Sequence, residues 1–426
     1  MKKKIAFVVY YSKQNRYSFN ALIGALEKIP FFNDLDIYFI ESELNLFKKL
    51  KVISTNHEKV LVGISFFSTQ IWDTHKLIKA LQKSFGDEII YLAGGPHPTG
   101  DPRGTLNMGF DIVVIGEGEE TIIELFQRLH NDEDYEKIKG LAYRNDNDEY
   151  IFTGKRSPVN LDDYAPFPWK QDKFGAIEIT RGCPYLCYFC QTPHILGTHP
   201  RHRSIESVVK YVRMMKEKNL TDVRFISPNA FSYGSKDGKK LNLAKLEQLL
   251  QAIKKTIAPR GRIFLGSFPS EVRPEHVNVD TLELIKNYCD NDNIIIGAQS
   301  GSQKMLNLCH REHTIADIHE AVRLTLEHGL KANVDMIFGL PGESKNDIKL
   351  TIKLMKTLTQ MGARIHTHSF LPLPQTPFAK KNVKKIDHAV KKEIEKLTSA
   401  GHAFGAWKKQ ERLAKKLSKY LITRKL

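Results

Sequence analysis

The sequence predicts an α/β protein with a doubly wound parallel sheet, then a partial (β/α)6 barrel and a basic helical C-terminal tail. Three observations predict this architecture. Short apolar, β-rich runs alternate with helical patterns, the alternation is interrupted over residues 138–175, and Lys and Arg gather at the end of the chain. Continuous apolar strands that alternate with helices are typical of parallel sheets covered on both faces. A chain of 426 residues is long enough for two or three such domains.

The first part of the chain predicts a Rossmann-like domain over residues 1–135. Its strand candidates are residues 4–10, 36–41, 59–66, 88–94 and 111–116, with helical patterns between them. The apolar run from Ile5 to Val9 is short and meets polar residues, so we interpret it as a first strand and not as a signal peptide. Ligands of doubly wound sheets bind at the carboxyl ends of the strands. Those ends are rich in Gly, Ser and Thr here.

The second part predicts a partial barrel over residues 176–380. A connector with a hairpin is expected over residues 136–175, because the polar run RNDND lies between two β-prone segments. Six further strand candidates follow, at residues 176–180, 222–227, 262–268, 293–299, 333–339 and 363–370, each separated by a helical pattern. Active sites of barrels lie at the carboxyl ends of the strands. Residues 381–426 are predicted to form a basic helical extension.

The basic tail and the small number of cysteines indicate which partners and which cell compartment to expect. The net charge is +16, and residues 379–426 contain 15 Lys and Arg against 4 Asp and Glu. Such a tail can bind nucleic acid, an anionic membrane surface or an acidic partner, but it is also typical of a solvated helical face. The sequence contains no run of about 18 apolar residues, so no transmembrane segment is expected. Five cysteines and no export signal indicate the cytoplasm.

The segment RGCPYLCYFCQTP, residues 181–193, places three cysteines in a C-x3-C-x2-C pattern directly after a predicted strand. Thiolates bind soft or borderline metals, and three of them can hold three irons of a 4Fe–4S cluster while the fourth iron stays open. Two other interpretations stay open from the residues alone. One is a zinc site completed by His194 or His199, and the other is three unrelated core cysteines. Cys289 and Cys309 lie outside the pattern.

The cysteine loop resembles that of the radical S-adenosylmethionine (radical SAM) enzymes. The resemblance implies that Cys183, Cys187 and Cys190 are the catalytic, metal-binding residues, and that S-adenosylmethionine binds the open iron and is cleaved to a 5′-deoxyadenosyl radical. The runs SPNAFSYG, SFPSEVRPE, NIIIGAQSGS, HREHT and VDMIFGLPGES resemble the family's strand-end motifs. They imply cofactor contacts from Tyr188, Phe189, Ser227, Ser267, Arg273, Gln299, Ser300, Arg311, Gly339 and Gly342.

Two departures from the family pattern stand out. Many relatives have Glu at the position of Gln299, and Gln can bond a ribose hydroxyl without bringing charge. The run SPNAFSYG has no acidic residue, although it takes the place of the motif that receives the amino group of S-adenosylmethionine.

The first domain is similar to the cobalamin-binding domain that precedes the barrel in one branch of this superfamily. The similarity rests on YLAGGPHPTG and GFDIVVIGEGEETIIEL. It implies contacts with cobalamin from Ser65, Ser68, Thr69, Gly94, Gly95, His97, Gly116, Glu117 and Gly118. Taken alone, these features also fit a flavin or nucleotide. The D-x-H-x-x-G motif that supplies a lower axial ligand is missing after the first strand, so we expect cobalt without a histidine ligand.

Together the resemblances predict a cobalamin-dependent radical SAM enzyme that methylates an unactivated carbon of an unknown small-molecule or lipid-like substrate. A ferredoxin or flavodoxin would supply electrons, and nucleic acid is a less favoured partner. Three alternatives remain. They are a cobalamin radical enzyme that cleaves, rearranges or cyclises its substrate, a tRNA methylthio-transferase and a cobalamin or redox sensor. The methylthio-transferases carry a second three-cysteine cluster, whereas residues 1–182 contain no cysteine here.

Overall fold

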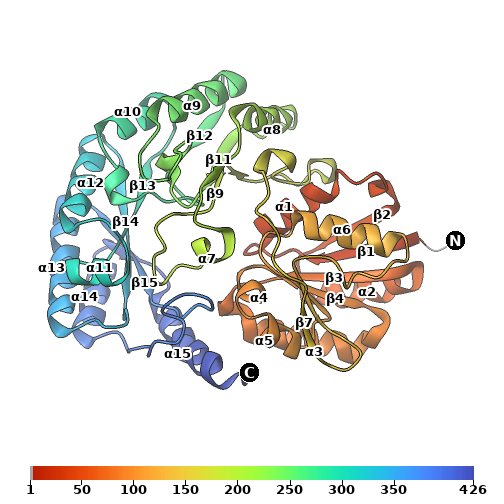
Figure 1. Cartoon of the computed structure of the whole chain (residues 1–426). Helices are drawn as coiled ribbons and strands as arrows, with labels where there is room; N and C mark the ends of the chain where they lie inside the picture. The colour runs from red at the N-terminus through yellow and green to blue at the C-terminus, as the bar shows by residue number, and fades with distance from the viewer. Residues whose placement is uncertain (1–2) are drawn as a thin grey trace. The chain divides into compact units, whose positions relative to one another are not determined.

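The computed structural model describes residues 3–426 and divides the chain into two compact units (Figure 1). Unit 1 comprises Met1–Gly175 and Arg424–Leu426, and unit 2 comprises Ala176–Thr423. The functional division into residues 1–135, 136–175, 176–380 and 381–426 stays a prediction.

Unit 1 is built on a seven-stranded sheet with the order β2-β1-β3-β4-β5-β6-β7. The strands are β1 (Lys3–Tyr10), β2 (Leu35–Ile40), β3 (His57–Ser65), β4 (Ile90–Gly94), β5 (Ile112–Val114), β6 (Leu141–Arg144) and β7 (Tyr150–Phe152). The first five pair in parallel, and β6 and β7 add an antiparallel hairpin at the edge. The centre of β1, from Ala6 to Val9, is fully buried, as expected for a strand covered on both faces.

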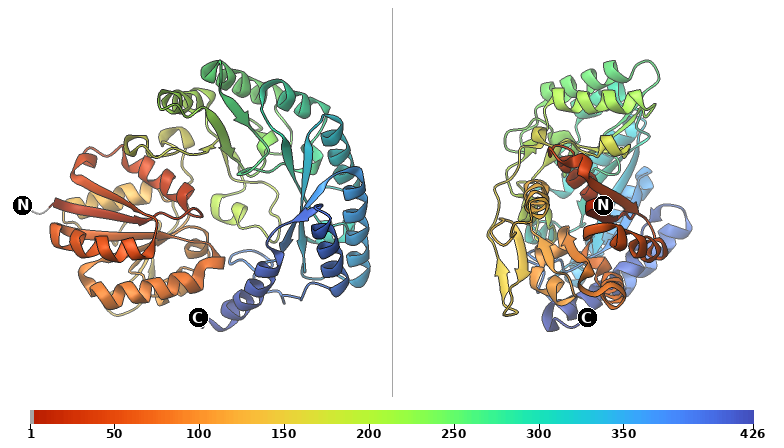
Figure 2. Two further views of the ribbon diagram at one scale, coloured as in Figure 1. Left: turned by 180° about the vertical axis from the view of Figure 1, so that it is seen from behind. Right: turned by 90° about the vertical axis from the view of Figure 1, so that its right-hand side faces the viewer.

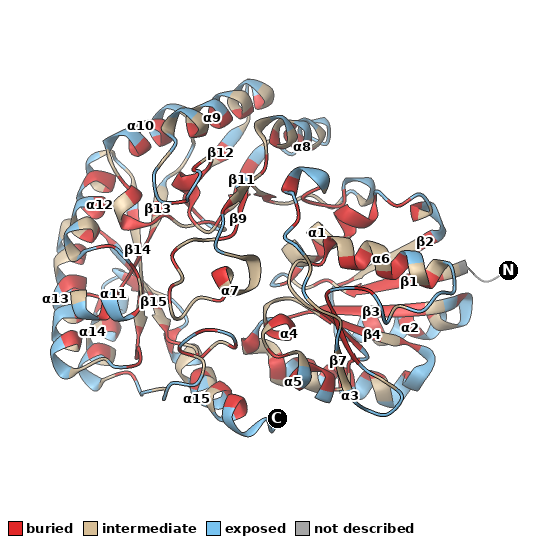
Figure 3. Cartoon of the chain, viewed as in Figure 1, coloured by how far each residue is buried: buried red, intermediate tan, exposed pale blue. Residues whose placement is uncertain are grey.

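Helices cover both faces of this sheet. Figure 1 shows α1 (Arg16–Leu26) and α6 (Glu119–His130) on one face and α2 (Glu43–Asn56) and α3 (Ile71–Phe85) on the other. The helices are amphipathic, with their buried residues toward the sheet (Figure 3). Phe7 of β1 packs on Phe126 of α6 with ring centroids 5.0 Å apart. Two short helices, α4 (Pro96–Gly100) and α5 (Pro102–Asn107), lie between β4 and β5.

Unit 2 is a curved parallel sheet in two hydrogen-bonded parts. One part has the order β12-β11-β8 and the other β13-β14-β15-β16. The strands are β8 (Ile177–Glu178), β11 (Asp222–Ile226), β12 (Arg262–Phe264), β13 (Asn293–Gln299), β14 (Lys331–Phe338), β15 (Arg364–Ser369) and β16 (Ala403–Phe404). A parallel bridge between Val272 and Ile296 joins the two parts.

The connecting helices of unit 2 lie outside the curve of its sheet (Figures 1 and 2). They are α8 (Ile205–Glu217), α9 (Leu243–Ile257), α10 (Val279–Tyr288), α12 (Ile315–Glu327) and α13 (Lys345–Met361). The loop of residues 181–193 and the short helix α7 (Thr192–Leu196) lie within the curve in both figures. The side of the sheet that faces them is called the concave face below.

The predicted fold class is confirmed, with two corrections in unit 2. The first strand is shorter than expected, because residues 176–180 form only β8 and the beginning of β9 (Thr180–Arg181). The basic tail is not purely helical, since β16 lies between α14 (His388–Ser399) and α15 (Trp407–Thr423) and pairs in parallel with β15. Two residues between helices give too short a pattern to predict a strand. Among residues 3–426, no helix combines the length and the apolar character that crossing a bilayer requires.

Candidate functional site

The three cysteines of residues 181–193 lie on a tightly shaped loop that follows β9. Gly182 has φ +91°, and a Cβ there would lie 2.4 Å from the carbonyl oxygen of His199. The backbone N–H of Cys183 donates to the carbonyl of Gly197 over 3.0 Å, and that of Cys190 donates to the carbonyl of Cys187 over 2.9 Å. The loop conformation is therefore held by backbone hydrogen bonds and by a glycine that no other residue can replace without a shift.

The three thiols are close enough to influence one another. Burial, with smaller contributions from the neighbouring Cys187 and Cys183, raises the pKa of Cys190 to about 11. Burial also raises the pKa of Cys183, again with a contribution from Cys187. Thiols held together in this way are expected to ionise when a metal takes up the negative charge. All five cysteines are free thiols.

The number of thiols in the loop bears on the metal that it can hold. A structural zinc site takes four ligands, whereas the loop supplies three cysteines. In a cubane each iron takes its own thiolate, so three thiols can hold three irons of a 4Fe–4S cluster. The residues fit the predicted cluster.

Tyr188 and Phe189 pack away from the loop into a small apolar cluster. Its buried members are Met305, Cys309, Leu340, Phe370 and Phe378. The Tyr188 ring stacks on His310 with centroids 5.6 Å apart, and the Tyr188 N–H donates to the carbonyl of Cys309 over 3.1 Å. These two aromatic residues therefore anchor the loop to the barrel.

A pair of buried arginines lies next to the cysteine loop, where the sequence places Arg273 and Arg311. The Nη1 of Arg311 lies 3.5 Å from the Sγ of Cys187, and its Nη2 donates to the carbonyl of Gly297 over 2.5 Å. Arg273 donates to the carbonyl of Arg311 and lies 3.3 Å above the centre of the Tyr185 ring. Both side chains are nearly inaccessible to solvent. A guanidinium beside a thiol favours the thiolate.

The other sequence-predicted residues of unit 2 lie at strand ends. Ser267 is buried, and its Oγ has no hydrogen-bond partner among residues 3–426. Such an orphaned donor is usually satisfied by water or a ligand. Ser227 and Ser300 bond backbone groups of the next turns instead. Gln299 is buried with φ +73°. The two remaining residues have positive φ angles, +77° at Gly339 and +85° at Gly342.

Sequence reasoning missed several polar residues of unit 2 that share the concave face. They are Glu271, Asp335, His366 and His368, and Tyr185 of the cysteine loop lies under Arg273. Burial, together with the charge of Asp335, raises the pKa of Glu271 to about 7, while Arg311 and Arg273 oppose the shift. A usable signal was present in the strand ARIHTHSF, because charged or polar residues at alternate positions are unusual in a parallel strand covered by helices.

The sequence-predicted residues of unit 1 also gather at the ends of strands, here β3, β4 and β5. Ser68 Oγ bonds His97 Nδ1 over 2.8 Å, and the N–H of Gly116 donates to Thr99 Oγ1 over 3.1 Å. Ser65 ends β3 and is buried, while Thr69 is partly exposed. Glu117 accepts from the N–H of Val159 over 3.2 Å.

The four glycines of this edge divide into two kinds. A Cβ at Gly116 would meet no atom within 4 Å, and one at Gly94 would meet only Val114 at 4.0 Å. These positions leave the open space that a large flat ligand requires, so the edge fits cobalamin. By contrast, a Cβ at Gly95 would clash with Ser65 Oγ at 2.6 Å, and one at Gly118 with Leu22 at 2.7 Å. Close packing within the unit explains those two glycines.

The run GGPHP predicts a loop at His97, but the structure places this residue in a helix. It lies in the first turn of α4 and is fully buried. Burial lowers its pKa to about 4, so the imidazole is neutral and fixed by Ser68. Pro96 at the first helical position starts this helix, because its fixed φ suits a helix N-terminus.

Two family models match the chain. The model of the radical SAM superfamily matches residues 177–355, and that of the B12 binding domain matches residues 34–126. Each match lies within one of the two structural units.

Two sequence relatives come from archaea. An uncharacterized protein of Methanopyrus kandleri is 26% identical over 67% of this chain and 61% of its own length. An uncharacterized methyltransferase of Pyrococcus horikoshii is 25% identical over 73% of this chain and 67% of its own length. The chain thus spans less than two thirds of the first relative.

Two solved structures share the fold. TsrM of Kitasatospora setae, a radical S-adenosylmethionine methyltransferase with cobalamin and a [4Fe-4S] cluster bound, gives a TM-score of 0.70 at 16% identity, over 89% of this chain and 74% of TsrM. The cobalamin-dependent S-adenosylmethionine radical enzyme OxsB gives 0.64 at 18% identity, over 83% of this chain and 52% of OxsB. The chain thus contains a region that matches the radical SAM superfamily and a region that matches the B12 binding domain, and it shares the fold of TsrM and OxsB.

Proposed function

We propose that this cobalamin-dependent radical SAM enzyme methylates an unactivated carbon of a small-molecule or lipid-like substrate. The observation that carries the proposal is the cysteine loop of unit 2. It brings three cysteines onto one short loop after β9, where the buried guanidinium of Arg311 lies 3.5 Å from the sulfur of Cys187.

The chain would hold the cluster through Cys183, Cys187 and Cys190. Arg311 would hold Cys187 in place, since its Nη1 donates to the sulfur over 3.5 Å. Tyr188 and Phe189 would fix the loop and keep water from it by packing into the apolar cluster. Together with the cluster, bound S-adenosylmethionine would supply a 5′-deoxyadenosyl radical, and bound cobalamin would supply the methyl group.

Other residues would bind the two organic cofactors. Ser267, whose hydroxyl has no partner in the described chain, would bond S-adenosylmethionine, with Gln299 and Gly339 at neighbouring strand ends. In unit 1, the open space beside Gly94 and Gly116 would receive cobalamin. Placement of reacting groups and exclusion of water are the contributions that a protein makes to such chemistry.

Anaerobic reconstitution tests the proposal. The full chain, loaded with iron and sulfide and given S-adenosylmethionine and a strong reductant, should form 5′-deoxyadenosine. The Cys187→Ala variant should lose the cluster and this product. Cys289→Ala is the matched control, because Cys289 lies at the end of α10, outside the loop. Absence of 5′-deoxyadenosine from the reconstituted wild-type chain, or zinc in place of iron, would sink the proposal.

Radical chemistry without methyl transfer is the second candidate, favoured by the likeness to OxsB, whose printed name describes a radical enzyme and not a methyltransferase. S-Adenosylmethionine with a deuterated methyl group separates the two candidates. Deuterium in the product supports methylation, and 5′-deoxyadenosine with no deuterium in any product supports the alternative. We also propose the cytoplasm as the compartment and a ferredoxin or flavodoxin as the electron donor.

A further inference from the structure

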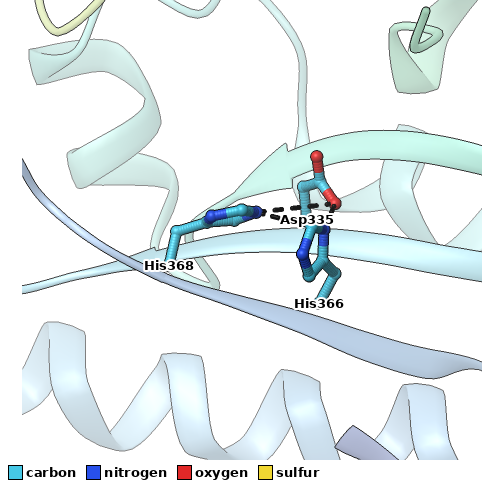
Figure 4. A group of neighbouring side chains, drawn as sticks. All are labelled: Asp335, His366 and His368. Atoms are coloured by element: carbon cyan, nitrogen blue, oxygen red, sulfur yellow. Dashed lines mark hydrogen bonds and ion pairs between the residues drawn. The ribbon is translucent and has the colours of Figure 1, made fainter. Parts of the chain in front are cut away.

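Two histidines and an aspartate of unit 2 point toward one another (Figure 4). His366 and His368 are two positions apart on β15, so their side chains lie on the same face of the sheet. Asp335 of β14 is the cross-strand neighbour of His366. One ligand atom from each residue lies within 4.8 Å of the other two. The register of two adjacent parallel strands thus brings together three side chains that can each bind a metal ion.

The distances between the three facing atoms match those between ligands of a single ion. His366 Nδ1 lies 2.8 Å from Asp335 Oδ1 and 3.1 Å from His368 Nε2, and His368 Nε2 lies 3.9 Å from Asp335 Oδ1. Two ligands that are each about 2.0 Å from a tetrahedral zinc ion lie about 3.3 Å apart, and this value falls inside the observed range. The three atoms therefore outline one face of a zinc coordination tetrahedron.

Neighbouring groups hold both imidazoles in place. The His366 ring stacks on Phe404, with centroids 4.6 Å apart and the two planes 10° apart. The rings of His366 and His368 meet edge to face, with centroids 4.1 Å apart. Both histidines and Asp335 belong to β-strands, which hold side chains more precisely than loops do. The three ligands therefore need little rearrangement to bind an ion.

Gln410 of α15 lies where a metal-bound histidine needs a hydrogen-bond acceptor. A histidine ligand donates its second N–H to such an acceptor, and the second nitrogen of His368, Nδ1, faces the Gln410 amide. The N–H of Ser369 donates to Gln410 Oε1 over 2.9 Å, and Gln410 Nε2 lies 3.4 Å from His368 Nδ1. At this distance the amide nitrogen makes at most a weak hydrogen bond. A rotation of the amide would let Oε1, with its two lone pairs, accept from both Ser369 and His368.

The ligand set is open on one side. The side chains of Asp335, His366 and His368 are 13%, 30% and 27% exposed. Three protein ligands with an open fourth position are typical of catalytic zinc sites, whereas structural sites are closed by four. Two positions before Asp335 on the same face of β14, the Oδ1 of Asn333 is buried and has no hydrogen-bond partner among residues 3–426. An orphaned acceptor of this kind indicates that water or a ligand completes this face.

We propose that Asp335, His366 and His368 bind a divalent metal ion, and that the ion is zinc, with an open position toward the concave face of unit 2. Two imidazoles and one carboxylate are ligands that zinc prefers, and zinc fits both the number of ligands and the distances between them. The open position takes water or an oxygen or nitrogen atom of a substrate. None of the three ligands belongs to the cysteine loop, so this second metal centre does not depend on the proposed radical chemistry.

Zinc uptake by the full chain tests the proposal. The chain is first reconstituted anaerobically with iron and sulfide so that the cysteine loop is occupied, then freed of excess metal and titrated with zinc chloride. We expect one zinc ion per chain, and X-ray absorption at the zinc edge should show nitrogen and oxygen neighbours at about 2.0–2.1 Å. Sulfur neighbours at about 2.3 Å would assign the ion to cysteine thiolates. That result, or a chain that retains no zinc, overturns the proposal.

Variants of the full chain identify the ligands. His366→Gln and Asp335→Asn should each weaken zinc binding by more than about 100-fold, because loss of a ligand exceeds the roughly 10–100-fold cost of losing its hydrogen-bond partner. His388 is exposed at the start of α14, so His388→Gln is the control and should bind zinc as the wild-type chain does. Gln410→Glu should tighten binding about tenfold, since a carboxylate is a stronger acceptor for the Nδ1–H of His368, and such a gain cannot come from misfolding. Wild-type affinity in His366→Gln, or no gain in Gln410→Glu, overturns the proposal.

Discussion

Replacing Gly182 by Ala should unfold the cysteine loop locally and prevent it from holding a cluster. Gly182 joins β9 to Cys183 and has φ +91°. An added Cβ would lie 2.4 Å from the carbonyl oxygen of His199 and 3.2 Å from that of Gly197. Both atoms belong to the backbone, and the Gly197 carbonyl also accepts the hydrogen bond of Cys183. Neither can turn aside as the end of a flexible side chain would.

The size of the effect can be separated into two contributions. A left-handed backbone costs an L-residue roughly 1–2 kcal/mol, and overpacking against atoms that cannot move costs about 1–3 kcal/mol more. Gly401 supplies the control, because it has φ +76° and a Cβ there would meet no atom within 4 Å. We therefore expect Gly182→Ala to lower the free energy of unfolding of unit 2 by about 3 kcal/mol and Gly401→Ala by about 1 kcal/mol.

Anaerobic thermal unfolding and iron analysis of both variants test this prediction. For a unit of this size, 1 kcal/mol lowers the melting temperature by about 2–4 °C. Gly182→Ala should therefore melt about 6–12 °C lower than the wild-type chain and lose most of its iron, while Gly401→Ala melts about 2–4 °C lower and keeps its iron. Equal shifts for the two variants, or a full iron complement in Gly182→Ala, would refute the steric argument.

Two further predictions concern buried carboxylates. Burial raises the pKa of Glu27 from 4.5 to about 7, so the folded state favours the protonated carboxyl. The stability that this preference contributes is complete below about pH 4.5 and is lost as the pH rises to about 7. The free energy of unfolding of Glu27→Gln, measured with urea and compared with that of the wild-type chain, should therefore rise by up to about 3 kcal/mol from pH 4 to pH 8. Burial alone would raise the pKa of Asp347, but hydrogen bonds from Ser302 and Ser344 hold it below its usual value. Its stabilisation is present near neutral pH and lost in acid, so Asp347→Asn should destabilise the protein at pH 7 by more than at pH 3, as followed by circular dichroism.

The strands and helices of this fold follow from patterns that act locally. The apolar run of β1 and the run NIIIGAQ of β13 are continuous because helices cover both faces. Capping residues such as Ser344, which accepts from the backbone of the third helical residue, mark helix starts in the sequence. β16 could not be predicted, since two residues carry no periodicity and their strand conformation depends on pairing with β15.

The candidate site was only half visible in the sequence. Spacing predicted Cys183, Cys187 and Cys190 as ligands, and the structure places all three on one short loop after β9. Asp335, His366 and His368, whose side chains converge in Figure 4, were missed because they come from different strands, and only the register of β14 against β15 places Asp335 opposite His366. Gln410 lies still further along the chain, so its contact with His368 Nδ1 depends wholly on tertiary structure.

The polar side chains on the concave face of unit 2 lower the stability of the fold, and this cost bears on the role of these side chains. Burying a polar group without a full set of hydrogen bonds costs roughly 1–3 kcal/mol. Burial and the charge of Asp335 raise the pKa of Glu271, and Ser267 lacks a partner in the described chain. An apolar layer of similar volume would stabilise the barrel as well or better. Stability therefore does not explain why this face is polar, whereas the proposed binding of S-adenosylmethionine would supply a partner for the Ser267 hydroxyl.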